Sequence, residues 1–463
     1  MLSCTRSPIA SSNMALAPDT IAAVATPPGR GGIGIVRVSG PLVATIARSL
    51  VGCEIVPRQA AFCAFKDGQG EVIDRGIALF FPGPKSFTGE DTLEVQGHGG
   101  PVVMDMLLQR TLELGARVAR PGEFSERAFL NGKVDLTQAE AIADLIDSAS
   151  QQAARCAMRS LEGGFSSKTK ELVNLLVDLR TYIEGALDFP EEEIDFLEDS
   201  QIQKRLRSFI SRADRLYREA EQGCLLREGM RIAIIGRPNV GKSSLLNRLA
   251  DRDSAIVTPV PGTTRDIISE EILIDGLPIR VADTAGLRVA RDVVEEEGIR
   301  RTWQAVERAD RILFVVQSGN GIEGEDQKLL HRFQKSGGVT IVHNKIDLTE
   351  AQPGVEERNQ VLNVYVSAKT GEGIDLLRGH LKACVGYKPV SEGGFMARRR
   401  HLEALGRARA LVQRGLDQLT AHRAGELLAE DLRLAQQAFG EITGEVTSDD
   451  LLGAIFSRFC VGK

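Results

Sequence analysis

The sequence predicts a multi-domain protein that combines α/β and all-helical parts, with one domain inserted into another. Three observations support this prediction. Short strands broken by glycine and proline fill the chain up to Gly132, which is typical of an α+β domain. Apolar residues at helical spacing follow from Thr137 and return after Tyr387. Between these helical stretches, strands and helices alternate from Met230 onward, which indicates an α/β domain with a parallel sheet.

The N-terminal part divides into a leader and the α+β domain. Residues 1–18 contain several serines and no acidic residue, so we expect a disordered leader, and either Met1 or Met14 is the true start. The α+β domain is expected to span 19–132, with a strand at Thr92–Val95 just before a glycine-rich turn.

The helical domain is predicted to be discontinuous, comprising 133–228 and 388–463. Thr137–Glu140 has the pattern of a capping box, in which the threonine hydroxyl and the glutamate satisfy free amide groups of the first turn. Gly163 and Gly164 interrupt the helical pattern, and a further helix is expected around Gln201–Gln222. The second piece carries one apolar stripe made of Leu428, Leu432, Ala435, Phe439 and Ile442.

The α/β domain is predicted to span 229–387. Its buried parallel strands are expected at Ile232–Ile235, Ile312–Val316 and Thr340–Val342, and Asp275-Gly276 is a hairpin signal. Because helical sequence flanks this domain on both sides, we expect it to be inserted into the helical domain.

Composition narrows the possible functions of the 463-residue chain. Its formal net charge of −6 argues against a protein that coats nucleic acid through bulk positive charge. Seven scattered cysteines without a C-x-x-C pair predict reduced thiols and a cytoplasmic location. No apolar run approaches the ~20 residues of a membrane span, so no membrane partner is expected.

A phosphate-binding loop is predicted at Gly236–Ser243, which fits G-x-x-x-x-G-K-[ST] between a strand and a helix. The glycines let backbone amides converge on phosphates, and the helix N-terminus adds positive potential. Lys242 would offset charge on the β- and γ-phosphates, and the Ser243 hydroxyl would bind magnesium.

Three later motifs predict guanine specificity. Asp283–Gly286 ends a strand, where a carboxylate can hold the magnesium shell. Asn344–Asp347 ends another strand, and Asp347 can accept hydrogen bonds from the ring N–H and exocyclic amine of guanine, a donor pair that adenine lacks. Ser367–Lys369 follows a third strand and would complete the base pocket. In this order, the motifs predict that the chain binds GTP.

The segment between the first two motifs, Thr258–Asp266, resembles the switch loop of the TrmE–Era–EngA-like bacterial GTPases, which implies that Thr264 binds magnesium. Leu287 stands where Ras-type enzymes carry a water-orienting glutamine, so hydrolysis needs another group. By resemblance to related GTPases, which carry an asparagine at this place in the loop, Asn239 would help hold a potassium ion that neutralises charge developing between the phosphates.

From about Asp19 to Lys463 the chain resembles the MnmE (TrmE) family of tRNA-modification GTPases. The resemblance is carried by DTIAAVATPPGRGGIGIVRVSG, SFTGEDTLEVQGHGGP, RPGEFSERAFLNGKVDLTQAEAIADLIDS, GTTRD, DTAGLR, FMARRRHLEAL and the terminal FCVGK. It implies an N-terminal folate-binding domain that also forms a homodimer, a helical domain and an inserted P-loop α/β G domain. It further implies a heterotetramer with an MnmG-type FAD protein and modification of the wobble uridine of certain tRNAs. A reduced folate, 5-formyl- or 5,10-methylene-tetrahydrofolate, would supply the one-carbon unit.

The resemblance also assigns residues to roles. Potassium would be held by Asn239, Thr258, Val260 and Thr263, magnesium by Ser243 and Thr264, and folate by Arg37, Glu94, Lys133 and Lys463. Glu295 would position the attacking water, although Glu296 and Glu297 adjoin it. Cys460 is either a participant in the modification chemistry or an apolar thiol at a helix end. The residues expected to contact GTP are Asn239, Val240, Gly241, Lys242, Ser243, Ser244, Thr258, Pro259, Val260, Pro261, Gly262, Thr263, Thr264, Asp283, Thr284, Ala285, Gly286, Asn344, Lys345, Ile346, Asp347, Ser367, Ala368 and Lys369.

Two alternatives remain at this stage. One is a GTP-switch factor for ribosome assembly of the Era/EngA type, and the other is a membrane-coupled GTPase, as in ferrous iron transport. In addition, Arg398–Arg400 would either contact tRNA phosphates or form a solvated helix face.

Overall fold

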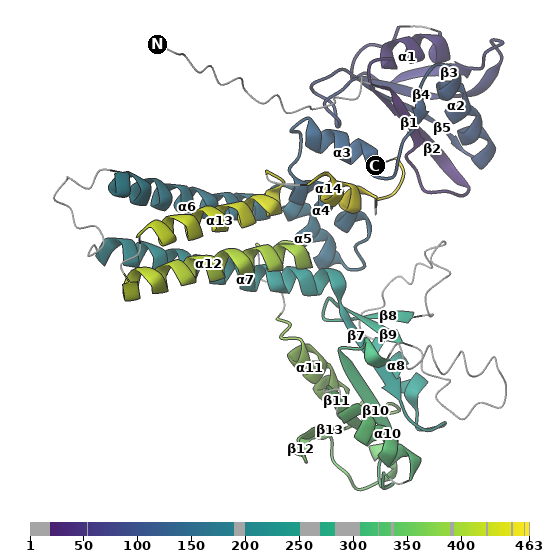
Figure 1. Cartoon of the computed structure of the whole chain (residues 1–463). Coiled ribbons are helices and arrows are strands. Elements are labelled where there is room, and N and C mark those ends of the chain that lie inside the picture. Colours follow the sequence, from purple (N-terminus) through teal and green to yellow (C-terminus); the bar gives the residue numbers. More distant parts are fainter. Residues whose placement is uncertain are drawn as a thin grey trace. The chain divides into compact units, whose positions relative to one another are not determined.

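The computed structural model describes residues 19–52, 54–188, 200–250, 269–282, 306–322, 324–334, 338–388, 393–422, 425–445, 448–457 and 459–462. The chain forms two compact units (Figure 1). The first unit combines residues up to Glu140 with those from Val446 onward, and the second is Ala141–Glu445. The predicted leader lies outside the described residues.

The first unit is built on a six-stranded sheet of order β3-β4-β5-β2-β1-β6. Its strands are β1 Ile21–Val24, β2 Gly31–Ser39, β3 Ala61–Lys66, β4 Val72–Phe81, β5 Thr92–Gly99 and β6 Arg117–Val118. The helices of this unit are α1 Val43–Val51, α2 Pro101–Glu113, α3 Glu123–Leu130 and α14 Asp449–Phe456, and α4 Leu136–Ile146 crosses the boundary between the units.

Side chains alternate in direction along the strands, and this gives the sheet two apolar faces. Val36 and Val38 pack with residues of α1 and α2, whereas Ile21 and Ala23 pack with Phe124 of α3. Successive side chains of a strand point to opposite faces. Residues between Val36 and Val38 therefore belong to the face on which α3 lies.

The last segment of the chain belongs to the first unit. The sequence assigned 388–463 as a whole to the helical domain, but the structure divides this range near Val446. Helix α14 packs against α3, with the rings of Phe456 and Phe129 6.3 Å apart. Local helical periodicity cannot distinguish which neighbour a short amphipathic helix packs against.

The start of α4 corrects the predicted capping box. The helix begins at Leu136, and Asp135 rather than Thr137 caps it. The Asp135 carboxylate accepts from the backbone N–H of Gln138 at 3.0 Å, and the Gln138 side chain accepts from the backbone N–H of Asp135, also at 3.0 Å. This is a reciprocal capping box two residues earlier in register.

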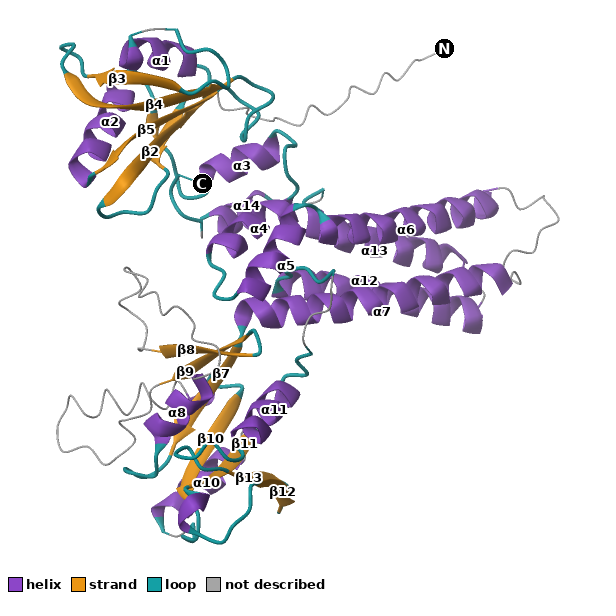
Figure 2. Ribbon diagram, turned by 180° about the vertical axis from the view of Figure 1, so that it is seen from behind, coloured by secondary structure: helices purple, strands orange, loops and turns teal. Residues whose placement is uncertain are grey.

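In the described residues, the helical part of the second unit contains the end of α4 and the helices α5 Gln151–Leu161, α6 Gly164–Asp188, α7 Ser200–Glu228, α12 Arg399–His422 and α13 Gly425–Thr443. Helix α12 packs against both α7 and α13, and α13 packs against α6 (Figure 2). The predicted break at Gly163 and the predicted stripe on α13 are confirmed, since Leu428, Leu432 and Phe439 lie in the core of this bundle.

The α/β part of the second unit has a seven-stranded sheet of order β12-β13-β11-β10-β7-β9-β8. The five inner strands are parallel, and β8 and β12 are antiparallel edge strands. The predicted hairpin is β8–β9. The elements are β7 Met230–Ile235, α8 Lys242–Ala250, β8 Ser269–Ile274, β9 Leu277–Ala282, β10 Arg311–Gln317, α10 Glu325–Gln334, β11 Val339–Asn344, the 3-10 turn Ile346–Leu348, β12 Gly354–Arg358, β13 Val361–Tyr365 and α11 Ile374–Cys384.

Parallel strands place their carboxyl ends at one edge of a sheet, where ligands of doubly wound folds bind. In this unit the ends of β7, β11 and β13 meet there, and each is followed by a predicted nucleotide motif. Among the described helices, none is both long and apolar enough to cross a membrane.

Candidate functional site

The loop between β7 and α8 has the backbone of a phosphate cradle. Gly236, Asn239 and Gly241 all have positive φ angles, of 156°, 61° and 94°. A Cβ on Gly241 would lie 2.4 Å from Nδ2 of Asn344, so the close approach of these two segments requires glycine. The Lys242 ammonium donates to the carbonyls of Gly236 and Arg237, at 2.9 Å each. The side chain of Lys242, the first residue of α8, therefore lies over the phosphate loop that precedes this helix.

Asn344 joins three of the predicted motifs. Its side chain is buried at 1% exposure. Nδ2 donates to the carbonyl of Val240 at 2.8 Å, and Oδ1 accepts from the backbone N–H of Ala368 at 3.0 Å. One buried amide therefore fixes the distance between the phosphate loop and the ends of β11 and β13.

Lys345 and Asp347, which follow Asn344, also form contacts with the neighbouring motifs. Lys345 has a φ of 66°, and its ammonium donates to the carbonyl of Asn239 at 2.6 Å. Asp347 is exposed, and its carboxylate accepts from the hydroxyl of the buried Ser367 at 2.6 Å. An oriented, exposed carboxylate beside this loop can accept a pair of N–H donors from a planar base.

The structure thus brings together three of the predicted nucleotide motifs, at 236–243, 344–347 and 367–369. Ser243 and Ser244 are exposed in the first turn of α8. The other predicted nucleotide and cation ligands lie outside the described residues, as does the predicted water-positioning residue. They are Thr258, Pro259, Val260, Pro261, Gly262, Thr263, Thr264, Asp283, Thr284, Ala285, Gly286 and Glu295.

The predicted folate residues form a second group, in the first unit. Arg37 and Glu94 are cross-strand partners on β2 and β5, and the guanidinium donates to the carboxylate at 2.9 Å. The guanidinium also lies 5.7 Å from the ring centre of Phe87 and 5.8 Å from that of Phe124. The sequence reasoning treated these two charges as separate, but the register of the sheet makes them one partly exposed ion pair.

Lys133 and the C-terminal tail border this ion pair. The Lys133 ammonium donates to the carbonyl of Pro84 at 2.9 Å, and Pro84 belongs to the same loop as Phe87. Arg37 also donates to the carbonyl of Gly462, at 3.4 Å. Lys463, the residue after Gly462, lies outside the described residues.

Cys460 is exposed and its thiol is free. Its backbone carbonyl accepts from the N–H of Gly122 at 3.3 Å, which ties the tail to the start of α3. A Cβ on Gly462 would lie 2.5 Å from the carbonyl of Val24, so the tail passes very close to the end of β1. The tail is therefore placed by tertiary contacts of the first unit.

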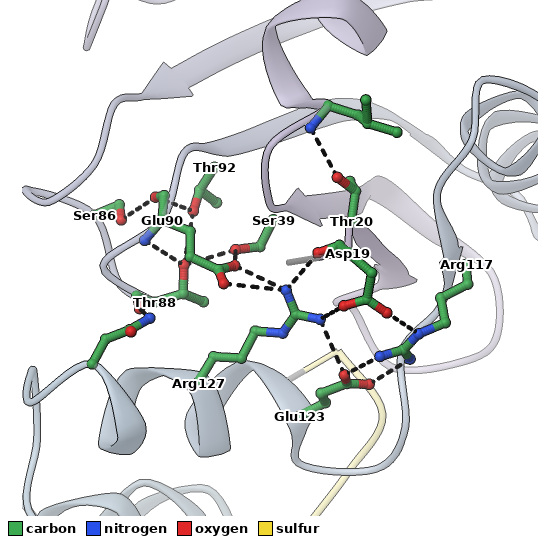
Figure 3. Close-up of polar contacts among 12 residues, drawn as sticks. Asp19, Thr20, Ser39, Ser86, Thr88, Glu90, Thr92, Arg117, Glu123 and Arg127 are labelled. Carbon is green, nitrogen blue, oxygen red and sulfur yellow. Dashed lines mark hydrogen bonds and ion pairs between the residues drawn. The ribbon is translucent and has the colours of Figure 1, made fainter. Parts of the chain in front are cut away.

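A buried ion network that the sequence reasoning missed supports this region (Figure 3). Glu123, the first residue of α3, is 2% exposed. It accepts from Arg117 at 2.8 Å and from Arg127 at 3.2 Å, and Arg127 also donates to Asp19 at 2.6 Å. The RPGEFSERAF motif contains Arg120 and Arg127, two of the arginines that pair with Glu123, and its i, i+4 pair of Glu123 and Arg127 was the available signal.

Hydrogen bonding outweighs burial at Glu123. Burial by itself raises the pKa of this carboxyl, but the Arg117 guanidinium, the backbone N–H of Arg120 and the Arg127 guanidinium lower the pKa to about 2. Burial also raises the pKa of Asp19, and hydrogen bonds from the same two arginines lower it below its usual value. Both carboxylates are therefore ionised at neutral pH.

The network extends into the loop before β5. Glu90 accepts from Arg127 at 3.0 Å and from the hydroxyl of Ser39 at 2.8 Å, and Ser39 in turn contacts Thr88 at 2.7 Å (Figure 3). Because Phe87 lies in the same loop, the network holds the loop that contacts Arg37.

The run Arg398–Arg400 is engaged within the second unit. Arg398 donates to Asp144 at 2.8 Å, Arg399 donates to Glu228 at 2.9 Å, and Arg400 donates to the carbonyl of Glu441 at 2.8 Å. Arg398 and Arg400 are partly buried and hold neighbouring helices together. Arg399 is 74% exposed, as expected for a solvated helix face.

Comparisons with known proteins match nearly the whole chain. A family model described as the MnmE helical domain matches residues 136–460, and one described as the GTP-binding protein TrmE N-terminus matches residues 20–133. The chain is 58% identical over 445 residues to the tRNA modification GTPase MnmE of Hydrogenovibrio crunogenus, covering 96% of this chain and 99% of that protein. It is 55% identical over 451 residues to the proteins of the same name from Photobacterium profundum and Vibrio cholerae, with the same coverage.

Proposed function

The chain belongs to the MnmE family of tRNA modification GTPases, and from this premise we propose that it acts at carbon 5 of the wobble uridine. It hydrolyses GTP, as its relatives at 55–58% identity do by name. With an MnmG-type FAD protein, it adds an aminomethyl or carboxymethylaminomethyl group to certain tRNAs. The ribosome-assembly alternative is not supported, because these relatives match 96% of the chain, far beyond the α/β part.

GTP binding is supported by the joining of the phosphate loop to Asn344 and Ala368 beside the exposed Asp347. The tRNA reaction is supported by the 55–58% identity to tRNA modification GTPases over 96% of the chain. The test is analysis of wobble nucleosides in tRNA from a strain that lacks this protein. The modified uridine should be absent and should return when the gene is restored. An unchanged nucleoside profile would refute the proposed reaction.

We assign the nucleotide contacts accordingly. Backbone amides of 236–241 and the N-terminus of α8 hold the phosphates, and Lys242 exchanges its carbonyl partners for β- and γ-phosphate oxygens. The ring N–H and amine of guanine donate to Asp347, which Ser367 orients. Magnesium neutralises phosphate charge when bound, and Ser243 and Thr264 are its proposed ligands.

Hydrolysis is proposed to depend on potassium, with Asn239, Thr258, Val260 and Thr263 as ligands and Glu295 positioning water indirectly. Asn239 has its backbone held by Lys345 at 2.6 Å, and Leu287 cannot orient water. Turnover of GTP by the full chain should therefore be at least about tenfold faster in potassium chloride than in sodium chloride at equal ionic strength, because a fitted cation offsets transition-state charge. Equal turnover in the two salts, measured by phosphate release, would refute this proposal.

The first unit is proposed to bind a reduced folate, 5-formyl- or 5,10-methylene-tetrahydrofolate, which supplies a one-carbon unit when bound. Arg37 suits the carboxylates of the glutamate tail, Glu94 suits the amine and ring N–H edge of the pterin, and Lys133 and Lys463 add positive charge. The rings of Phe87 and Phe124 beside Arg37 offer apolar contact to a flat ligand. This set of donors, acceptor and rings fits the group.

Replacing Arg37 with glutamine should weaken binding of 5-formyltetrahydrofolate to the full chain by about 10–100-fold, because a charge-assisted hydrogen bond contributes about 1.5–3 kcal/mol. Isothermal titration calorimetry measures the affinity independently of turnover. Arg48→Gln, an exposed cation on α1, is the matched control and should bind as the unchanged chain does. If both variants keep full affinity, Arg37 does not contact the folate.

The remaining assignments concern partners and location. We propose a homodimer and a heterotetramer with the FAD protein. Phe62 and Ile77, cross-strand partners on β3 and β4, are 76% and 37% exposed and offer apolar area to a second copy. Cys460 is proposed to lie beside the folate, and the free thiols of the described cysteines accord with a cytoplasmic location.

A further inference from the structure

The first half of α7 exposes a set of cations that neither the nucleotide site nor the folate proposal uses. Because an α-helix turns ~100° per residue, these side chains lie within an arc of ~160° and along ~21 Å of the helix. They lie opposite the buried residues Leu206, Phe209 and Ala213. We call them the basic stripe: Lys204, Arg205, Arg207, Arg212, Arg215 and Arg218.

Among the residues that the structure describes, two carboxylates of α7 beside the basic stripe, Asp214 and Glu219, are engaged by cations of other helices. Asp214 pairs with Arg409 of α12 at 3.0 Å, and Glu219 pairs with Lys168 of α6 at 2.6 Å. Within the described part of the chain, Lys204, Arg207, Arg212 and Arg215 form no ion pair. The stripe therefore keeps its positive charge, although the whole chain has a net charge of −6.

The chemistry of the basic stripe favours phosphates over an acidic protein. Five of its six members are arginines, whose planar guanidinium matches phosphate oxygens with two hydrogen bonds. The core of a protein–protein interface needs large apolar or aromatic side chains. None of the large hydrophobic side chains described on α7 is exposed.

We propose that the basic stripe of α7 binds the phosphate backbone of the substrate tRNA. The inference rests on the proposed function in one respect, which is that the tRNA contacts this chain and not only the FAD protein. Arg398–Arg400, which the sequence singled out for this role, hold helices together through Asp144, Glu228 and Glu441. The structure thus moves the predicted phosphate contact from the start of α12 to α7.

The test combines Arg207→Gln, Arg212→Gln and Arg215→Gln in the full chain. The probe is an unmodified tRNA transcript with uridine at the wobble position, and affinity is measured at several sodium chloride concentrations. The triple variant should bind at least about tenfold more weakly, and the slope of log affinity against log salt should become shallower by about 2–3, because each lost phosphate contact removes about 0.7–0.9 from the slope. GTP hydrolysis without tRNA should be unchanged.

A matched control removes the same charge elsewhere: Lys66→Gln, Arg308→Gln and Lys328→Gln, all exposed and outside α7. This variant should keep the affinity and salt slope of the unchanged chain. The inference is overturned if the α7 variant binds tRNA normally, or if the control variant loses as much affinity for tRNA. It is also overturned if the α7 variant binds tRNA normally but no longer supports modification, a result that would indicate an acidic protein partner. If the unchanged chain itself fails to bind the transcript, the chain does not contact tRNA directly, and that part of the proposed function is wrong as well.

Discussion

Replacing Asp347 with asparagine should weaken GTP binding by about 10²–10⁴-fold and create affinity for xanthosine triphosphate. The carboxylate would lose two charge-assisted hydrogen bonds from guanine, each contributing about 1.5–3 kcal/mol. Xanthine carries an oxygen in place of the exocyclic amine, and the new side-chain amide can donate to it. Ser367 holds Asp347 at 2.6 Å, so the replacement side chain should keep its position.

Competition binding with the two nucleotides measures this change of specificity. Asp375→Asn is the matched control, because Asp375 is an exposed aspartate at the start of α11 in the same α/β part. It should bind GTP as the unchanged chain does and should not bind xanthosine triphosphate. An Asp347→Asn variant with normal GTP affinity would show that Asp347 does not read the base.

The second large effect is expected from Glu123→Gln. This change removes the negative charge shared by Arg117 and Arg127. It leaves the largely buried guanidinium of Arg127 with Asp19 and Glu90 as partners. Breaking a buried ion pair on one side typically costs about 3–5 kcal/mol. Because both arginines keep another carboxylate, we expect the free energy of unfolding of the first unit to fall by the lower end of this range, about 3 kcal/mol.

Hydrogen exchange of peptides from residues 19–140 in the full chain reports on this unit alone. Glu113→Gln is the control, because Glu113 pairs with Arg110 at 2.9 Å but is 60% exposed. Surface pairs contribute about 0–1 kcal/mol, so exchange should change little in that variant. Equal exchange in the two variants would mean that the network does not stabilise the unit.

The same network predicts how stability depends on pH. Because folding lowers the pKa of Glu123 from 4.5 to about 2, its contribution is complete above pH 4.5 and is lost as the pH falls towards 2. The loss should amount to about 3 kcal/mol. In Glu123→Gln this part of the acid dependence should be missing, and a variant as acid-sensitive as the unchanged chain would contradict the assignment.

The nucleotide site could be predicted from the sequence because its parts are local. A phosphate loop, Asn344–Asp347 and Ser367–Lys369 each follow a recognisable strand, and parallel strands bring their ends to one edge of the sheet. Only the structure showed that Asn344 joins all three through one buried amide. The pairing of Val240 with Asn344 spans 104 residues, and no local pattern records such a contact.

In the first unit, by contrast, the contacts of the candidate site could not be predicted from the sequence. The sequence offered Arg37 and Glu94 as separate charges, and the register of β2 with β5 made them an ion pair. The sequence assigned no role to Glu123, and the structure pairs it with Arg117, Arg120 and Arg127. Capping also moved from Thr137 to Asp135, because Asp135–Gln138 overlaps the predicted pattern and the helix begins at Leu136.

By itself, the sequence determined the order of the domains, the apolar stripes of the helices and the nucleotide motifs, because each depends on residues a few positions apart. The tertiary structure decided which unit the C-terminal tail joins, which charges are neutralised and which remain exposed. Arg398–Arg400 and the basic stripe of α7 look alike as sequence, and only the carboxylates and carbonyls packed around the first run distinguish them. Electrostatic partners are set by distance in space, and distance in space follows from packing rather than from position along the chain.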